Sequence, residues 1–179
     1  MSMNFILIGP RGAGKSKVSR SLSKLTNYPV VSTDSIIVYE AGGMPIPKYV
    51  DSFGWKKFRE LEYAILKKLE NSNGIILDCG GGVIFDLDEN ENEILSQRKL
   101  DILRKMGSIV LLERDFKELV EKVAGDSTRP DLAKNKMYED ILKRRLPYYQ
   151  QSANIKINAS NLKKEEIAQQ ILQKFGWKS

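Results

Sequence analysis

The stretch that decides the fold is NFILIGPRGAGKS, residues 4–16. It opens with an apolar run of strand length and continues into residues 9–16, which match the phosphate-loop pattern G-x-x-x-x-G-K-[ST] in full. Val18, Leu22 and Leu25 follow at the spacing of an amphipathic helix. A buried strand, a glycine-rich loop and a helix in this order predict the first unit of an α/β domain that binds a nucleotide.

The phosphate loop offers several kinds of contact to one nucleotide. Its glycines let the backbone N–H groups of Gly12, Ala13 and Gly14 turn toward a phosphate, and the positive end of the following helix adds to the attraction. In this pattern Lys15 reaches the outer phosphates and the Ser16 hydroxyl binds Mg²⁺. We therefore expect a nucleotide to bind here with Mg²⁺. The alternative, a chance glycine-rich turn, is disfavoured because a predicted strand and a predicted helix flank the loop.

The rest of the chain alternates strand and helix patterns. Further strands are predicted at 28–32, 74–77, 108–112 and 154–158, and further helices at 34–42, 55–69, 94–106, 116–124, 137–152 and 163–175. Such alternation implies parallel strands joined by right-handed crossovers. We expect one domain over residues 1–179, with three α/β/α layers and a five-stranded parallel sheet. Between the helices predicted at 116–124 and 137–152 lies a polar stretch with glycine, proline and mixed charges.

The composition excludes several classes of chemistry. The chain has no histidine and a single cysteine, Cys79, which excludes His-dependent nucleophilic catalysis, an internal disulfide and a Cys/His zinc site. The net charge is +6, but the basic residues are scattered among acidic ones, which argues against a nucleic-acid partner. No apolar run is long enough to cross a membrane, and the first strand begins too early for a targeting peptide. We expect a cytoplasmic monomer without a membrane partner.

Four further features fall where ligands bind in open α/β sheets, at the carboxyl ends of the strands. Asp34 follows the second predicted strand, and three consecutive glycines, Gly80, Gly81 and Gly82, follow the third. A strand end needs fewer glycines than three, so we expect something small to lie against that backbone. Two arginines complete the set.

The two arginines are Arg59 and Arg145. Arg59 precedes Glu62 by three residues, close enough on a helix to be held by it. Arg145 lies on the apolar face of its predicted helix, where a guanidinium needs an anion. Either arginine could pair internally with Glu62 or another acid. Both together beside a phosphate loop favour a substrate that carries a carboxylate.

The order and spacing of these motifs resemble the shikimate kinase family over nearly the whole chain. The matching elements are the phosphate loop, Asp34, FRELE (58–62), GGG (80–82), TRP (128–130) and RLPYYQQSA (145–153). The resemblance implies a P-loop kinase fold with a mobile lid at about 125–136, whose polar composition fits a flap that excludes water. It also implies an enzyme that phosphorylates the 3-hydroxyl of shikimate with ATP and Mg²⁺, in the pathway to chorismate and the aromatic amino acids.

Residue roles follow from the resemblance by matching position. Asp34 is expected to bind the acceptor hydroxyls and act as the base, and Arg59 and Arg145 to clamp the shikimate carboxylate. The backbone of the glycine triplet, with Gly81 at its centre, is expected to contact the substrate ring. Arg129 is expected to descend with the lid onto the ATP phosphates, so that Lys15, Asp34 and Arg129 form the catalytic set.

One departure from the family concerns the metal. Ser32 stands where the family has the first acid of a D-x-D pattern, an acid that helps to hold Mg²⁺. Asp78, at the tip of the third predicted strand, offers a replacement, because many P-loop proteins place the acid that supports Mg²⁺ there. We therefore assign Asp78, with Ser16, to the metal. The alternative is that Asp78 caps a turn or pairs with Lys15.

Two smaller departures affect the nucleotide. Lys17 replaces a threonine, so a side-chain contact to the α-phosphate is lost while the backbone N–H remains for ATP. Lys122 replaces an arginine near the adenine, which weakens stacking there.

Alternative functions are a P-loop kinase of another small hydroxy acid such as gluconate, and a catalytically silent relative that binds ligand or a partner, which Ser32 favours. A nucleic-acid-binding module is the remotest.

Overall fold

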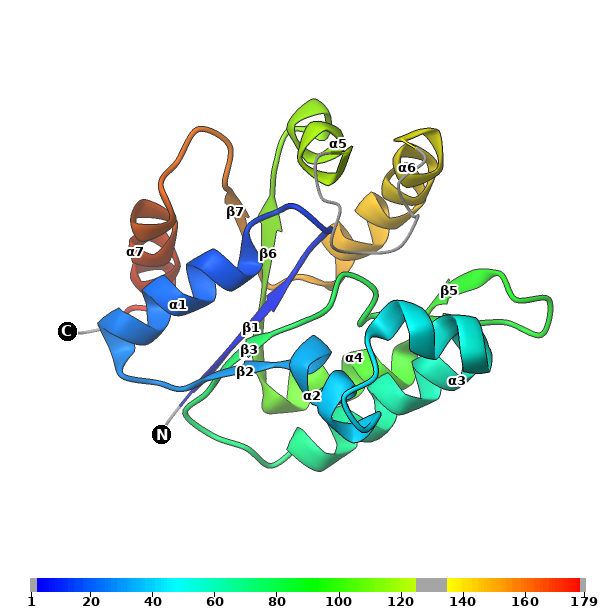
Figure 1. Ribbon diagram of the computed structural model, residues 1–179. Coiled ribbons are helices and arrows are strands. Elements are labelled where there is room, and N and C mark those ends of the chain that lie inside the picture. Colours follow the sequence, from blue (N-terminus) through cyan, green and yellow to red (C-terminus); the bar gives the residue numbers. More distant parts are fainter. Residues whose placement is uncertain (1–2, 125–134, 178–179) are drawn as a thin grey trace.

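The computed structural model describes residues 3–124 and 135–177. Its centre is a parallel sheet in the order β2-β3-β1-β6-β7 (Figure 1). The strands are β1 (Asn4–Ile8), β2 (Val30–Ser32), β3 (Ile76–Asp78), β6 (Gly107–Glu113) and β7 (Ile155–Asn158). The expected five-stranded parallel sheet is therefore confirmed.

Helices cover both faces of this sheet. They are α1 (Lys15–Thr26), α2 (Thr33–Glu40), α3 (Ile46–Leu69), α4 (Gln97–Met106), α5 (Phe116–Ala124), α6 (Asn135–Ser152) and α7 (Lys164–Lys174). Buried residues of α1 and α7 pack on one face, together with residues of α5 and the first part of α6. Buried residues of α3 and α4 pack on the other face. The layers are those of an α/β/α domain, as Figure 1 shows.

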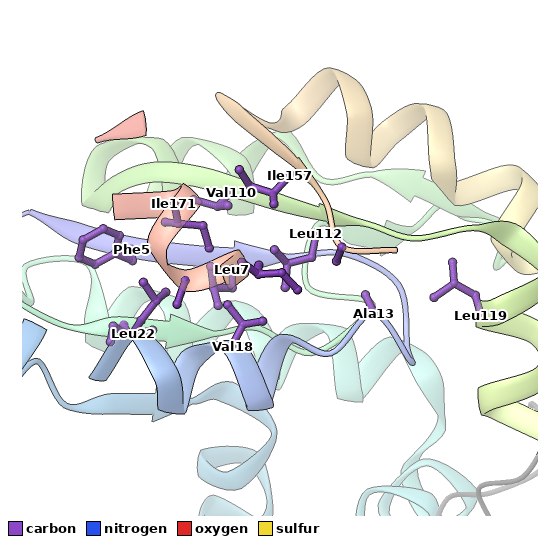
Figure 2. Packing of buried hydrophobic residues seen from close by; sticks show 14 of the residues in the cluster. Phe5, Leu7, Ala13, Val18, Leu22, Val110, Leu112, Leu119, Ile157 and Ile171 are labelled. Carbon is purple, nitrogen blue, oxygen red and sulfur yellow. The ribbon is translucent and has the colours of Figure 1, made fainter. Parts of the chain in front are cut away.

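The central strand explains why the first apolar run is buried on both sides. Side chains of a strand point alternately to opposite faces. Phe5 and Leu7 of β1 join the core against α1 and α7, whereas Ile6 and Ile8 join the core against α3 and α4. Figure 2 shows Leu7 among side chains from α1, β6 and α7. All five positions of β1 are buried because helices cover both faces of the strand.

The register of the sheet brings three loops to one edge. Leu7 of β1 pairs with Asp78 of β3, and Asp78 pairs with Ser32 of β2. Parallel strands end at the same edge, so the phosphate loop, the glycine triplet and the start of α2 emerge side by side. This edge is where the ligands of open α/β sheets bind.

One predicted helix begins late in the structure, and another is preceded by a helical segment that was not predicted. The helix predicted at 94–106 begins only at Gln97, because Glu93–Leu95 forms strand β5, paired antiparallel with β4 (Phe85–Leu87). Ser96 caps α4 by accepting a hydrogen bond from the Lys99 backbone N–H. The helix predicted from residue 55 is confirmed as the second part of α3, because the non-helical dihedral angles of Gly54 (φ 80°, ψ 162°) separate it from a first part that begins at Ile46.

The proposed lid falls mostly outside the described residues. Residues 125–134 of this stretch, including Arg129, lie outside the described residues, whereas residues 135 and 136 are the first two of α6. Among the described helices, none combines the length and the apolar character that a membrane span requires.

Candidate active site

A cavity of about 1230 Å³ opens at the carboxyl edge of the sheet. It brings together most of the residues that the sequence singled out: Gly12, Gly14, Lys15, Ser16, Lys17, Asp34, Asp78, Gly80 and Gly81. Ala13, within the loop, is fully buried, and Gly82 does not line the cavity. Arg59 and Arg145 do not line it either; they contact the carbonyl oxygens of Gly82 and Gly81. The phosphate loop and Asp34 thus share one space.

The phosphate loop has the backbone that an anion site requires. Gly14 has a left-handed conformation (φ 95°) that a residue with a side chain rarely adopts, and helix α1 begins directly after it. Lys15 is 9% exposed, and its Nζ donates to the carbonyl oxygens of Gly9 at 2.8 Å and Pro10 at 3.0 Å. The ammonium group is therefore held at the mouth of the loop.

The first glycine of the triplet makes room for Asp34. A Cβ atom at Gly80 would overlap the Asp34 carboxylate. The Gly80 backbone N–H donates to Thr33 Oγ1 at 2.8 Å, which ties the triplet to the start of α2. None of the three glycines has a positive φ, so the triplet provides space rather than an unusual turn. What lies against the backbone at Gly80 is the side chain of Asp34.

The third glycine makes room for Arg59 in the same way. A Cβ atom at Gly82 would overlap the guanidinium group, whose Nη1 donates to the Gly82 carbonyl at 3.2 Å. The same Nη1 lies 2.8 Å from Glu62 Oε2, and both side chains are almost fully buried. The predicted pairing of Arg59 with Glu62 is confirmed.

The carbonyl of the middle glycine faces helix α6. Arg145 Nη1 donates to the Gly81 oxygen at 3.3 Å, and the Tyr149 hydroxyl donates to the same oxygen. Burial raises the pKa of Tyr149, so this hydroxyl keeps its proton. The glycine triplet therefore lies between Asp34 on one side and two arginines on the other.

Both arginines share a second carboxylate, Glu93 of strand β5. Glu93 Oε1 accepts from Arg59 Nη2 at 3.0 Å and from Arg145 Nη2, and Glu93 Oε2 accepts from Arg145 Nε at 2.9 Å. Burial opposes ionisation of Glu93, but the hydrogen bond and charge of Arg145 and the charges of Arg59 and Arg144 lower its pKa. Pairing of the arginines with internal acids, the alternative considered from sequence, is thus present in the structure.

The pairs continue into a larger ionic cluster behind the triplet. Lys99 is fully buried, and its Nζ lies 3.1 Å from both Glu62 Oε2 and Asp86 Oδ1 and donates to the Phe85 carbonyl at 2.8 Å. Arg98 joins Asp86 to Glu60. Sequence reasoning identified neither Glu93 nor Lys99, because both stand in charged stretches that resemble solvated surface.

Comparison with known proteins identifies the family. The family model described as shikimate kinase matches residues 11–175. A shikimate kinase of Leptospira biflexa serovar Patoc is 67% identical over 177 residues, which cover 99% of this chain and 98% of that one. The chain belongs to the shikimate kinase family. The resemblance inferred from the motifs is confirmed.

Further relatives agree in length and in fold. A shikimate kinase of Leptospira borgpetersenii serovar Hardjo-bovis is 49% identical over 177 residues, covering 98% of this chain and 99% of that one. The structure of a shikimate kinase from Acinetobacter baumannii in complex with shikimate superposes with a TM-score of 0.84 at 27% identity, covering 98% and 93% of the two chains. The whole chain therefore corresponds to a shikimate kinase fold.

The cavity of this shikimate kinase family member has a basic rim on the nucleotide side. Arg114, which the sequence analysis missed, donates from Nη1 to Glu118 at 2.9 Å and from Nε to the Ala13 carbonyl at 3.4 Å. Lys122, Lys163 and Lys164 line the same cavity. Burial and the charge of Arg114 lower the pKa of Lys122. A basic rim suits an anionic ligand.

Proposed function

We propose that the enzyme transfers the terminal phosphoryl group of ATP to the 3-hydroxyl of shikimate. The observation that carries the proposal is the position of Asp34, whose carboxylate rests against Gly80 in the cavity that also contains Lys15 and Ser16. A base for the acceptor hydroxyl and a cradle for the phosphates thus face one space. The 67% identity to a shikimate kinase along the full chain supports the choice of substrate.

The phosphate loop and its cations act on the nucleotide by positioning its phosphates and neutralising their charge. The backbone N–H groups of Gly12, Ala13 and Gly14 and the positive end of α1 attract the phosphates. Lys15 exchanges the two loop carbonyls for phosphate oxygens, since a carbonyl is a weaker partner for an ammonium group than an anion is. The Lys17 backbone N–H extends the cradle, and Arg129 adds a cation from outside the described residues. Phosphoryl transfer requires little more than this.

The acceptor side orients the hydroxy acid. Asp34 accepts the proton of the attacking hydroxyl, which raises the negative charge on that oxygen as it approaches the phosphorus. Arg59 and Arg145 bind the carboxylate of the substrate, because a planar guanidinium fits a carboxylate with two parallel hydrogen bonds. The backbone of Gly80, Gly81 and Gly82 forms the surface beneath the substrate ring.

Ser16 and Asp78 fit a magnesium ion. Asp78 is 7% exposed and lines the same cavity as Ser16, so two oxygen donors face the space beside Lys15. Mg²⁺ prefers oxygen ligands and keeps several waters, so it does not need a cage of three acids. When bound with ATP, the ion neutralises phosphate charge. Ser16 and Asp78 are the residues that we assign to it.

A coupled assay of ADP release tests the proposal. We expect turnover with shikimate and Mg²⁺, and none when gluconate replaces shikimate or when the metal is chelated. NMR of the product should place the phosphate on the 3-hydroxyl. Turnover with gluconate but not with shikimate would favour the alternative of a P-loop kinase that acts on another small hydroxy acid. A protein that binds ATP and shikimate without turnover would be the silent relative.

A further inference from the structure

The β4–β5 hairpin inserts an acid between two arginines from different helices. Figure 1 shows the hairpin between α3, which carries Arg59, and α6, which carries Arg145. Its turn is internally bonded, since Asp88 Oδ1 accepts from the backbone N–H groups of Asn90 and Asn92 at 2.9 and 2.8 Å. Glu93 follows this turn as the first residue of strand β5. A structured turn thus positions the Glu93 carboxylate between the two arginines.

Glu93 occupies the edge of Arg145 that binds carboxylates best. Glu93 accepts hydrogen bonds from Nε and Nη2 of Arg145, the pair of donors that forms two parallel hydrogen bonds with one carboxylate. The remaining nitrogen, Nη1, is engaged by the Gly81 carbonyl. Arg59 meets Glu93 through Nη2, and its Nη1 is shared by Glu62 and Gly82. A second carboxylate cannot take the same donors while Glu93 holds them.

The charge balance leads to the same conclusion. The ionic cluster joined by these pairs contains four cations, Arg59, Arg98, Lys99 and Arg145, and four carboxylates, Glu60, Glu62, Asp86 and Glu93. It is therefore neutral. A ligand carboxylate added to it would be a surplus negative charge in a largely buried place, which is costly. The balance is kept if one carboxylate leaves as another enters.

We propose that Glu93 is an internal competitor that holds Arg59 and Arg145 in the empty enzyme and is displaced when the substrate carboxylate binds. The inference rests on the proposed function, which assigns the substrate carboxylate to the same two arginines. Glu93 is suited to leave, because its side chain is 17% exposed, whereas Glu62 is 3% exposed and also holds Lys99. In the empty state Glu93 keeps both guanidinium groups paired and aligned; in the bound state it faces solvent.

Calorimetry with paired variants and paired ligands tests the displacement. The E93Q variant removes the competing charge, and E89Q removes the same charge from an exposed glutamate in the turn of the same hairpin. Each protein is titrated with shikimate and with its methyl ester, which lacks the negative charge. We expect E93Q to bind shikimate about tenfold more tightly than wild type, since one like charge is gone from the site. The ester should gain much less, and E89Q should match wild type.

Two outcomes overturn different statements. If wild type binds and phosphorylates shikimate but E93Q binds it equally or more weakly, Glu93 is a fixed partner of the arginines and the competitor role is wrong. If wild type neither binds nor phosphorylates shikimate, the proposed function fails first. The two failures are distinguished by the wild-type measurement alone.

A second measurement does not depend on how E93Q folds. Hydrogen exchange of wild type is followed in a peptide spanning residues 88–95, with and without shikimate. Displacement of Glu93 releases one anchor of β5, while β4 stays tied to Ser96, Arg98 and Lys99. Exchange in this peptide should therefore become faster when shikimate binds, while exchange in α3 becomes slower. Slower exchange in residues 88–95 on binding would contradict the displacement.

Discussion

Ser32 and Asp78 lie side by side where β2 and β3 end, directly paired in the parallel register of the two strands. Ser32 is the N-cap of α2, and its hydroxyl accepts a hydrogen bond from the Ser35 backbone N–H. Both residues line the cavity that contains Ser16. A carboxylate on β3 therefore stands next to the position where the family has an acid on β2.

Replacing Asp78 by asparagine should weaken the enzyme through the metal. We expect D78N to lower kcat by roughly ten- to a hundredfold and to raise the Mg²⁺ concentration needed for half-maximal activity, because residues that orient a metal act on this scale. ADP release measured across a magnesium titration gives both quantities.

The neighbouring strand supplies the control for this change. In the double variant S32D/D78N the carboxylate moves from β3 to β2, and an aspartate can still cap α2. We expect it to recover part of the lost activity. If D78N alone keeps both the turnover and the magnesium requirement of wild type, Asp78 does not serve the metal.

The three glycines should differ when each is changed to alanine. G80A displaces the Asp34 carboxylate, so kcat should fall most, whereas G82A displaces the Arg59 guanidinium, so KM for shikimate should rise most. G81A is the milder control, since its nearest atom, the Arg11 backbone nitrogen, would be 3.4 Å away. Steady-state kinetics with shikimate and ATP varied in turn separates the effects. Equal losses in all three variants would contradict this assignment.

Lys99 should be among the most sensitive positions for stability. K99M leaves Glu62 and Asp86 as buried carboxylates without this cation, and we expect the free energy of unfolding to fall by about 3–5 kcal/mol. The matched change K105M alters a lysine that is mostly exposed and should cost less than about 0.5 kcal/mol. Urea denaturation of both variants checks the difference, and similar losses would count against a structural role for the buried cation.

Acid should destabilise the protein partly through Asp86. Burial opposes ionisation of this carboxyl, but the hydrogen bonds of Arg98 and Ser96 and the charge of Lys99 lower its pKa from 3.8 to about 2. The unfolded chain therefore takes up the proton first, so this contribution to stability is complete above about pH 4 and is lost as the pH falls toward 2. Unfolding free energies measured from about pH 5 to pH 3 should fall more steeply for wild type than for D86N. Parallel slopes would contradict it.

Local patterns made much of the fold predictable. The strand β1, the phosphate loop and α1 follow each other within one short segment, so hydrophobic period and glycine spacing identified all three. The pair Arg59–Glu62 was predictable for the same reason, since residues three apart on a helix are neighbours. The Asp34 position after β2 followed from the strand order.

Contacts between distant segments were not predictable from such patterns. Ile94 and Leu95 continue an apolar spacing into α4, yet they pair with β4 instead, and only Ser96 marks the true helix start as its cap. Glu93 lies in DENENE (88–93), a run that reads as a solvated turn. Nothing local distinguishes its carboxylate from its neighbours, because its partners are 34 and 52 residues away.

The same separation bears on how the two halves of the active site form. The contacts of Lys15 with Gly9 and Pro10 close loops of only a few residues, whereas Glu93 must meet two helices that are remote along the chain. Closing longer loops costs more entropy and delays assembly. In refolding experiments we therefore expect the contacts inside the phosphate loop to form before the contacts of Glu93. A newly made chain would shape its phosphate loop before Glu93 aligns the two arginines.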